Sequence, residues 1–408
     1  MTEREWLDSL GTLGMKLGLE NITELLLLTG NPQKDVKMIH VAGSDGKGST
    51  SAMIHSVLKA AGKKAGLYTS PHVNAVNERI VMDSMISDDE MDDVIREIRP
   101  KAEWMCQHGR SCTYFEVLTA MAFLYFKNKN ADYAVIETGL GGRFDATNVI
   151  IPEVSIITRI SLEHTAVLGD TIEKIAFEKA GIIKDGVPVV TANTDGALRV
   201  ISEVSSERNS KLIYVDIKNV SDIIVTENGT SLTYSDDNYE VGIPGSYQAE
   251  NAAVVIETMR LLGMAEEDIR NGLRDSKWRY RMERKGDFIL DVTHTSTGSK
   301  GLAEDVLKKY GKVILVFGIL DDKDLMSISS NLSKVASKVI VTRPDSDRAV
   351  PPEKVMTEMS KHHNNVKFTN NVNEAMDLAM RIRNRDEIIM VTGSFYMIGD
   401  AEKWIKKI

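Results

Sequence analysis

Residues 43–50, with the sequence Gly-Ser-Asp-Gly-Lys-Gly-Ser-Thr, have the residue types of a phosphate-binding turn. They follow an apolar run at 38–42 that is typical of a buried strand, and Ser49 and Thr50 are residue types that often begin a helix. A strand-to-helix turn directs backbone N–H groups and the positive helix end at one point, and Lys47 adds a full charge. A hydroxyl of Ser49 or Thr50 would suit magnesium, so the turn predicts a nucleoside triphosphate ligand.

The spacing within this turn differs from that of the usual P-loop. The usual motif has four residues between its first glycine and its Gly-Lys pair, whereas here only Ser44 and Asp45 separate Gly43 from Gly46-Lys47. A kinase-type motif is therefore a poor match. The alternative interpretation is a glycine-rich turn with a solvated lysine and no ligand.

Glu137 stands at the carboxyl end of an apolar run, residues 133–136, and is followed by three glycines and Arg143. A carboxylate in this position suits the magnesium ion that accompanies a bound triphosphate. The alternative is a structural carboxylate, but a buried carboxylate without a cation is rare because its desolvation is costly. We therefore expect Glu137 to bind magnesium beside the phosphates.

Other polar side chains follow apolar runs and give weaker signals. Ser70 offers a hydroxyl to a metal, and His72, Asn77 and Arg79 can hydrogen-bond a substrate, although a Ser-Pro turn with a surface histidine is common. Judged by spacing alone, His164 is an ordinary loop or core histidine, and Lys179, at the end of a helical pattern, is a solvated lysine.

Apolar runs and helical patterns alternate from residue 37 to about 191, which indicates a parallel sheet covered by helices. The expected strands are 38–42, 65–68, 133–136, 154–158 and 187–191. Open sheets of this type bind ligands at the carboxyl ends of their strands, where the candidate residues lie. Residues 212–242 differ, because two extended stretches flank Asn228-Gly229, a strong hairpin signal. Helical periodicity returns at 247–262.

A second alternating series begins near residue 288, with strands expected at 288–292, 312–317, 338–342, 366–368 and 387–391. The predicted fold class is α/β, with a P-loop-type parallel-sheet ATP-binding domain followed by a smaller Rossmann-like α/β domain. We place the first domain at 1–280, including a small β appendage at about 211–244, and the second at 286–408. The basic stretch at about 277–285 is the expected linker.

The bulk composition excludes several classes of protein. The chain has 408 residues, 42 % hydrophobic and 27 % charged, with a formal charge of −9, which disfavours nucleic-acid and membrane-surface binders. Its only cysteines, Cys106 and Cys112, are too few for a zinc knuckle or a disulfide framework, so we expect free thiols and a cytoplasmic location. No long heptad pattern is evident, and we expect a monomer without nucleic-acid or membrane partners.

Taken together, the motifs resemble the folylpolyglutamate synthase and dihydrofolate synthase family of the Mur ligase superfamily. The similarity extends over most of the chain in family order. It comprises residues 43–49, 69–72, 77–80, 115–119, 137–143, 145–148, 164–165, 169–172, 178–184, 245–248, 251, 281, 291, 294, 317–318, 323–324 and 391–394.

The resemblance implies a role for each candidate residue. Lys47 would hold the phosphates, Ser70 and Glu137 would bind one magnesium ion, and His164, Glu137 and a carbamylated Lys179 would bind a second, with Lys47, Glu137, His164 and Lys179 as the catalytic set. A carbamate is an anionic oxygen donor, which free lysine is not. The implied ATP-binding residues are Gly43, Ser44, Asp45, Gly46, Lys47, Gly48, Ser49, Thr50, Gln248, Asn251, Arg281, Asp291 and His294. The implied substrate-binding residues are Thr69, Ser70, Pro71, His72, Asn77 and Arg79.

The resemblance also implies the reaction. A pterin or folate carboxylate would attack the γ-phosphate of ATP, and the amine of L-glutamate would displace phosphate from the resulting acyl phosphate. Two alternatives stay open: a ligase of the same superfamily acting on another carboxylic acid or a modified pterin coenzyme, and a nucleotide-binding regulatory protein without catalysis.

The sequence departs from the family pattern at three places. Asp45 replaces the common asparagine and puts a negative charge in the phosphate turn, and Arg279-Tyr280 replaces the common Pro-Gly before Arg281. Residues 292–296, Val-Thr-His-Thr-Ser, replace the usual Gly-Ala-His-Asn-Pro. These departures bear on the acid that is used more than on ATP.

Overall fold

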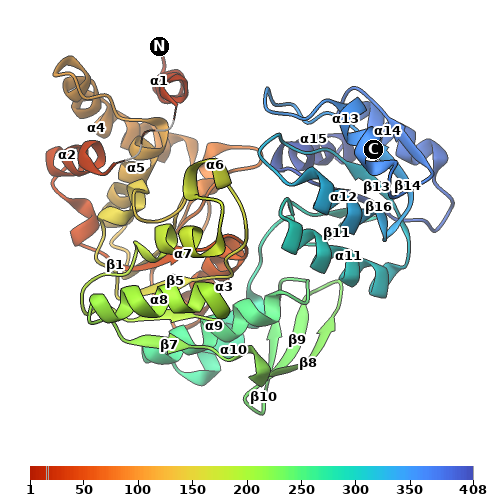
Figure 1. Ribbon diagram of the computed structural model, residues 1–408. Coiled ribbons are helices and arrows are strands. Elements are labelled where there is room, and N and C mark those ends of the chain that lie inside the picture. The colour runs from red at the N-terminus through yellow and green to blue at the C-terminus, as the bar shows by residue number, and fades with distance from the viewer. Residues whose placement is uncertain (15, 17, 408) are drawn as a thin grey trace. The chain divides into compact units, whose positions relative to one another are not determined.

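The computed structural model describes residues 1–14, 16 and 18–407, which form two compact units. The first unit comprises residues 1–160, 168–217 and 251–275, and the second comprises residues 161–167, 218–250 and 276–408. Each unit is built on its own mostly parallel sheet (Figure 1). The predicted α/β fold class is therefore confirmed.

The sheet of the first unit has seven strands in the order β3-β2-β4-β1-β5-β6-β7. All neighbours are parallel except β2 and β3. The five predicted strands lie within one to two residues of the observed ones, whereas the edge strands β3 and β7 were not predicted as parts of this sheet. The bounds are β1 Lys37–Ala42, β2 Ala65–Tyr68, β3 Ile80–Val81, β4 Tyr133–Glu137, β5 Val154–Ile157, β6 Val189–Thr191 and β7 Leu212–Tyr214.

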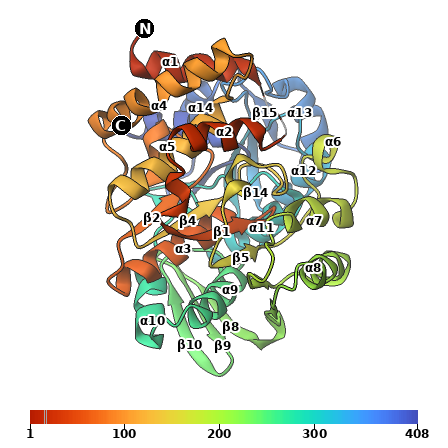
Figure 2. The same ribbon diagram turned by 90° about the vertical axis from the view of Figure 1, so that its left-hand side faces the viewer.

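Helices cover this sheet, and Figure 2 shows α1 lying beside α4. Helices α4 and α5 begin at capping boxes, in which Ser87 pairs with Glu90 and Thr113 with Glu116. The α-helices are α1 Glu3–Ser9, α2 Glu20–Leu28, α3 Lys47–Ala60, α4 Asp88–Gln107, α5 Tyr114–Asn128, α6 Thr165–Leu168, α7 Ile172–Ala180, α8 Asp195–Glu207, α9 Gln248–Leu261 and α10 Glu266–Asp275. Short 3-10 turns are η1 Leu10–Leu13, η2 Pro32–Lys34, η3 Val76–Arg79, η4 Ala146–Val149 and η5 Ile217–Asn219.

Two clusters of buried side chains make the core of the first unit. One joins strand residues such as Met38 and Tyr68 to the apolar faces of α2, α4 and α5, including Phe123 and Phe126. The other packs Ile157 of β5 against α7 and α8. Burial of this apolar surface fixes the sheet whose carboxyl edge carries the candidate site.

A three-stranded antiparallel sheet, in the order β10-β9-β8, belongs to the second unit. Its strands are β8 Val220–Val225, β9 Thr230–Tyr234 and β10 Asp237–Val241. The predicted Asn228-Gly229 turn joins β8 to β9, where the Thr226 N–H donates to the Gly229 carbonyl at 2.8 Å. The sequence indicated two extended stretches here and missed β10.

The main sheet of the second unit has the order β11-β12-β16-β13-β14-β15, and only β11 runs antiparallel to its neighbour. Its strands are β11 Glu283–Lys285, β12 Phe288–Leu290, β13 Val313–Phe317, β14 Ala336–Val341, β15 Val366–Phe368 and β16 Ile389–Thr392. Its helices are α11 Ser296–Tyr310, α12 Leu325–Ser333, α13 Pro352–Met359, α14 Val372–Ile382 and α15 Phe395–Ile405. Three residues of the predicted linker thus form an edge strand, while the proposed domain boundaries stay a prediction.

Two further features concern the whole described chain. Cys106 is exposed and Cys112 buried, and both are free thiols, as expected. Within residues 1–14, 16 and 18–407, no helix is both long and apolar enough to cross a membrane.

Candidate functional site

The phosphate turn connects β1 to α3 at the carboxyl edge of the first sheet. Helix α3 begins at Lys47, two residues before Ser49, and its N-cap is Gly46 with φ 89° and no side-chain cap. The expectation that Ser49 or Thr50 begins the helix is therefore wrong, because a glycine in the left-handed region lets the chain turn earlier. The first N–H groups of α3 have no partners within the helix and are suited to an anion.

Two backbone groups of the turn have another function. The N–H groups of Ser44 and Asp45 both donate to the Arg159 carbonyl, at 2.9 and 3.1 Å. These bonds fasten the turn to the segment after β5. The binding of phosphate by this turn stays a prediction, and it would rest on the amides in the first turn of α3. Nothing in the sequence around Arg159 signalled this contact.

Gly43 and Gly46 must be glycines for steric reasons as well. A Cβ on Gly43 would lie 1.8 Å from Thr158 Oγ1, and one on Gly46 would lie 2.5 Å from Asn251 Oδ1. Both residues have positive φ, 151° and 89°. Asn251, expected near an adenine, thus lies against the phosphate turn in the first unit, and its contact with a nucleotide stays a prediction.

Two lysines converge on the same backbone oxygen of the turn. Lys47 Nζ donates to the Gly43 carbonyl at 2.7 Å and to the Ser44 carbonyl at 3.3 Å, and Lys179 Nζ donates to the Gly43 carbonyl at 2.8 Å. Lys179 is only 1 % exposed, so it is not the solvated lysine that its spacing alone suggested. The structure therefore brings two residues of the predicted catalytic set together at one oxygen atom.

Glu137 ends β4 opposite Val41 of β1, so it lies beside the start of the phosphate turn. Its side chain is 3 % exposed, and its Oε2 accepts the Ser70 N–H at 3.1 Å. Two buried hydroxyl oxygens, Thr50 Oγ1 and Thr138 Oγ1, have no hydrogen-bond partner in the described part of the chain. Carboxylate and hydroxyl oxygens are the donors that magnesium prefers, so this edge fits the ion.

No group of three or more His, Cys, Asp or Glu side chains that could hold a metal ion occurs among the described residues.

The glycine loop after β4 is held from inside by Asp145. The carboxylate accepts the N–H groups of Gly139 and Leu140 at 2.9 and 2.8 Å, and the N–H and hydroxyl of Thr147 at 3.0 and 2.5 Å. Burial raises the pKa of Asp145 above its usual value, although these hydrogen bonds counteract it. Behind it, His40 Nε2 contacts Thr147 Oγ1 at 2.8 Å. Asp145 therefore fixes the backbone that follows Glu137.

The loop predicted to bind the acid runs from Thr69 to Arg79, and its Ser70–Pro71 bond is cis. Arg79 Nε donates to His72 Nδ1 at 2.9 Å, and burial, followed by the Arg79 charge, lowers the pKa of His72 to about 4. Two loop residues predicted to bind substrate are thus bonded to each other, with His72 neutral near pH 7.

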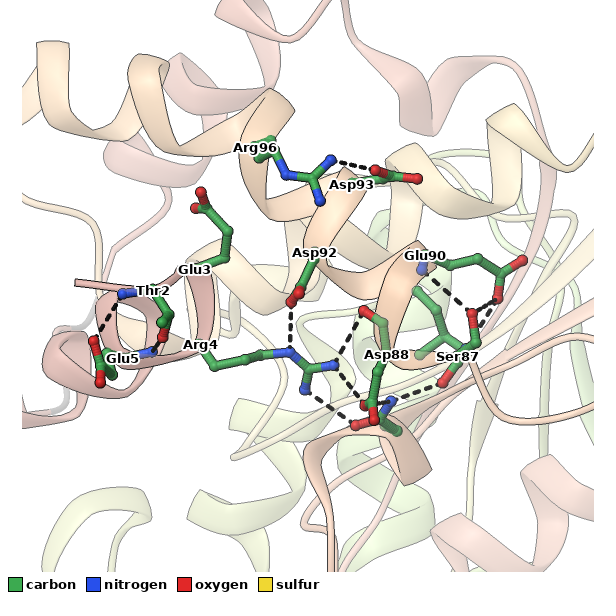
Figure 3. A network of polar contacts seen from close by, with 12 residues as sticks. Thr2, Glu3, Arg4, Glu5, Ser87, Asp88, Glu90, Asp92, Asp93 and Arg96 are labelled. Atoms are coloured by element: carbon green, nitrogen blue, oxygen red, sulfur yellow. Dashed lines mark hydrogen bonds and ion pairs between the residues drawn. The ribbon is translucent and has the colours of Figure 1, made fainter.

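Asn77 of the same loop is hydrogen-bonded within the protein. Its Oδ1 accepts from Arg4 at 3.1 Å, and its Nδ2 donates to the Ile86 carbonyl and to Asp88. Arg4, on α1, also contacts Asp88 and Asp92, both at 2.9 Å (Figure 3). Asn77 thus anchors the loop to the N-terminal helix, and its predicted contact with substrate stays a prediction.

The remaining predicted residues lie in the second unit or at its border. His164 has φ 46°, and its Nδ1 lies 3.5 Å from Asp322 Oδ2. Asp291 is fully buried, and its two oxygens accept the Met282 and Thr293 N–H groups at 2.8 and 2.7 Å. Burial, followed by the Lys323 charge, lowers the pKa of His294 to about 4. Gln248 begins α9 and is fully buried.

Known proteins match both parts of the chain. Residues 41–259 match the Mur ligase middle domain, and residues 280–395 match the Mur ligase glutamate ligase domain. The chain is 33 % identical to the dihydrofolate synthase/folylpolyglutamate synthase of Bacillus subtilis, over 99 % of this chain and 98 % of that one. The chain belongs to this family of Mur ligases.

Solved structures of family members agree with the fold. Mycobacterium tuberculosis folylpolyglutamate synthase complexed with ADP superposes with a TM-score of 0.92 at 28 % identity, covering 99 % of this chain and 98 % of that one. E. coli FolC in complex with DHPP and ADP gives 0.88 at 27 % identity, covering 100 % and 98 %. The resemblance inferred from the motifs is confirmed.

The structure shows the surroundings of two unusual residues, Asp45 and Tyr280. Asp45 is half-buried, and its N–H is one of the two that hold the turn to Arg159. Tyr280 has a positive φ of 59°. A positive φ is uncommon for tyrosine, so the contacts around Tyr280 must hold this backbone conformation.

Proposed function

We propose that this protein is an ATP-dependent ligase that joins L-glutamate to the carboxylate of a pterin or folate acid. The observation that carries the proposal is the near full-length similarity to dihydrofolate synthase/folylpolyglutamate synthases. The carboxyl edge of the first sheet agrees with it, because Lys47, Lys179 and Glu137 lie around a phosphate turn there.

The proposed chemistry proceeds in two displacements. A carboxylate oxygen of the acid attacks the γ-phosphorus of ATP, the bond to the β-phosphate oxygen breaks, and ADP and an acyl phosphate result. The glutamate amine then attacks the acyl carbon, phosphate leaves, and the nitrogen loses a proton. Lys47 and the N–H groups of α3 stabilise charge on the phosphates, while the loop from Ser70 to Arg79 orients the acid.

Magnesium bound at this edge would neutralise the phosphate charge. Glu137, Ser70 and Thr50 are the residues that would hold it. We propose His164, Glu137 and Lys179, the last as a carbamate, for a second ion. Two ammonium groups on one carbonyl oxygen repel each other, and carbamylation of Lys179 would replace one positive charge with a negative one beside Lys47. Carbon dioxide depletion should then lower activity, and full activity after depletion would exclude the carbamate.

A substrate panel tests the proposed function. Purified protein is incubated with ATP and magnesium and with each pairing of dihydropteroate, a reduced folate or an unrelated carboxylic acid with L-glutamate or another amino acid. We expect stoichiometric ADP and a new glutamyl amide, detected by mass, with dihydropteroate or the folate. Turnover with another acid alone would make the protein a ligase of different specificity. ATP binding without turnover on any pairing would make it a regulatory protein.

Two further parts of the proposal concern its state in the cell. We propose that it acts as a monomer in the cytoplasm, where its two thiols would stay reduced. Light scattering of the purified protein tests the first point, because a mass of twice the 45.3 kDa chain would contradict it.

A further inference from the structure

Arg281 lies between two residues with left-handed backbone. Tyr280 has φ 59° and Met282 has φ 45°, and neither is glycine. Such conformations cost energy in a residue with a side chain and persist only where the surroundings hold them. The contacts of the two flanking residues therefore explain how this segment is kept in place.

Tyr280 is held at three of its groups. Its phenol donates to Glu402 Oε2 at 2.8 Å, its N–H donates to Glu283 Oε2 at 2.8 Å, and its carbonyl accepts the Val292 N–H at 3.0 Å. The side chain is only 3 % exposed. On the other side of Arg281, the Met282 N–H donates to Asp291 Oδ2 at 2.8 Å. Both flanks of Arg281 are thus fixed by carboxylates.

Glu402 is the centre of this arrangement. It lies on α15, is 1 % exposed, and forms ion pairs with Arg279 and Lys285 in addition to the bond from Tyr280. A buried carboxylate is costly unless it is paired and hydrogen-bonded, and Glu402 has three partners from the single segment 279–285. Lys406, the exposed residue that follows α15, approaches the Glu402 carboxylate at 3.5 Å.

The residues next to Arg281 supply contacts that a glycine would not need. A glycine at position 280 would adopt a positive φ without side-chain contacts. Here Arg279 pairs with Glu402 and lies 4.5 Å over the Tyr280 ring. The residue with positive φ is therefore held through the side chains of its own segment and of α15.

The side chain of Arg281 has a nitrogen without a hydrogen-bond partner among the described residues. This nitrogen is the buried Nε. A buried guanidinium N–H without a partner is a donor available to an anionic ligand.

We propose that Glu402 and Tyr280 are positioning residues that hold the left-handed backbone on both sides of Arg281 and thereby orient its guanidinium. The inference rests on the proposed function and on the ATP-binding role that the family resemblance implies for Arg281. In a purely structural role, the cluster would stabilise the second unit without any effect specific to Arg281.

The first experiment compares Tyr280→Gly with Tyr280→Ala. Both remove the ring and the phenol, but only glycine adopts positive φ without steric cost. We expect Tyr280→Gly to retain about tenfold more kcat/KM for ATP than Tyr280→Ala. If the ring mattered only through packing, glycine would be equal to alanine or worse, and that result would overturn the proposal.

The second experiment is a double-mutant cycle that remains informative if alanine at 280 prevents folding. Tyr280→Phe removes one hydroxyl, and we expect it to lower kcat/KM for ATP several-fold in the wild type but to have no effect in an Arg281→Ala background. Equal effects in both backgrounds would show that the bond acts independently of Arg281. Lys406→Ala is the matched control, because it removes an exposed partner of Glu402 outside the segment and should leave kinetics unchanged.

Affinity for the nonhydrolysable analogue AMPPCP, measured by calorimetry, separates the two proposals. If the wild type forms no glutamyl amide, the proposed function fails, while the ratio of AMPPCP affinities between the glycine and alanine variants still tests positioning. If amide forms and that ratio is one, positioning alone fails.

Discussion

The phosphate turn of the first unit and the Arg281 segment of the second both contain residues with positive φ, but they stabilise this conformation in different ways. The turn uses Gly43 and Gly46, which need no side-chain support, whereas the segment uses Tyr280 and Met282, which are held by Glu402, Glu283 and Asp291. A glycine adopts a positive φ without side-chain contacts, whereas the tyrosine depends on carboxylates, of which Glu402 lies 122 positions further along the chain.

We expect the largest effect from a substitution that removes the negative charge beside the phosphate turn but keeps the size of the side chain. Glu137→Gln keeps an oxygen to accept the Ser70 N–H but cannot neutralise magnesium. We expect amide formation to fall about a thousandfold with little change in melting temperature. Unchanged ATP consumption and product formation in this variant would contradict the role of Glu137.

The next largest effect distinguishes a glycine that is needed because of a close neighbour from a glycine that is needed only for its positive φ. Gly46→Ala would place a Cβ 2.5 Å from Asn251 Oδ1, whereas a Cβ added to Gly62, with φ 71°, would meet no atom within 4 Å. Gly62→Ala therefore carries similar backbone strain without the clash. We expect Gly46→Ala to weaken AMPPCP binding about a hundredfold, or roughly 2.7 kcal/mol, and Gly62→Ala to lower stability alone. Equal binding by the two variants would show that the close approach to Asn251 is unimportant.

The pH dependence of the free energy of unfolding distinguishes two buried groups, His40 in the first unit and Glu402 in the second. Burial, followed by the Lys184 charge, lowers the pKa of His40 from 6.5 to about 3. Between pH 6.5 and 3, His40 therefore binds a proton in the unfolded chain but not in the folded one. The free energy of unfolding falls as the pH falls through this range. Burial opposes ionisation of Glu402, but bonds from Lys285 and Tyr280 and the Arg279 charge lower its pKa to about 2. Its contribution is present above about pH 4.5 and is lost as pH falls through 2.

Urea unfolding between pH 5 and 6.5 checks this difference. His40→Gln should flatten the dependence of stability on pH by up to about 1.4 kcal/mol per pH unit, whereas Glu402→Gln should leave the slope in this window unchanged. An unaltered slope in His40→Gln would mean that His40 is not the neutral buried group described.

The smallest effect concerns the charge at Asp45. Asp45→Asn removes a negative charge from the phosphate turn while the backbone bond to Arg159 is kept. We expect AMPPCP to bind about two- to fivefold more tightly at low salt, with the difference shrinking as salt is added. Weaker binding by this variant would show that the carboxylate supports the turn.

The sequence predicted those parts of the molecule that depend on local pattern. The strands and the phosphate turn follow from short apolar runs and from the spacing of Gly43, Gly46 and Lys47. Contacts between distant residues could not be predicted in this way. Tyr280 and Glu402 are 122 positions apart, and Arg4 and Asn77 are 73 apart, so neither residue type nor spacing indicated their bonds.

The bond between Arg4 and Asn77 has a practical consequence for work with this protein. Arg4 lies on α1 and joins this helix to the loop predicted to hold the acid. A shortened form of the protein that lacks α1 would lose this bond and with it one anchor of the loop. Assays of acid specificity should therefore use protein in which α1 is retained.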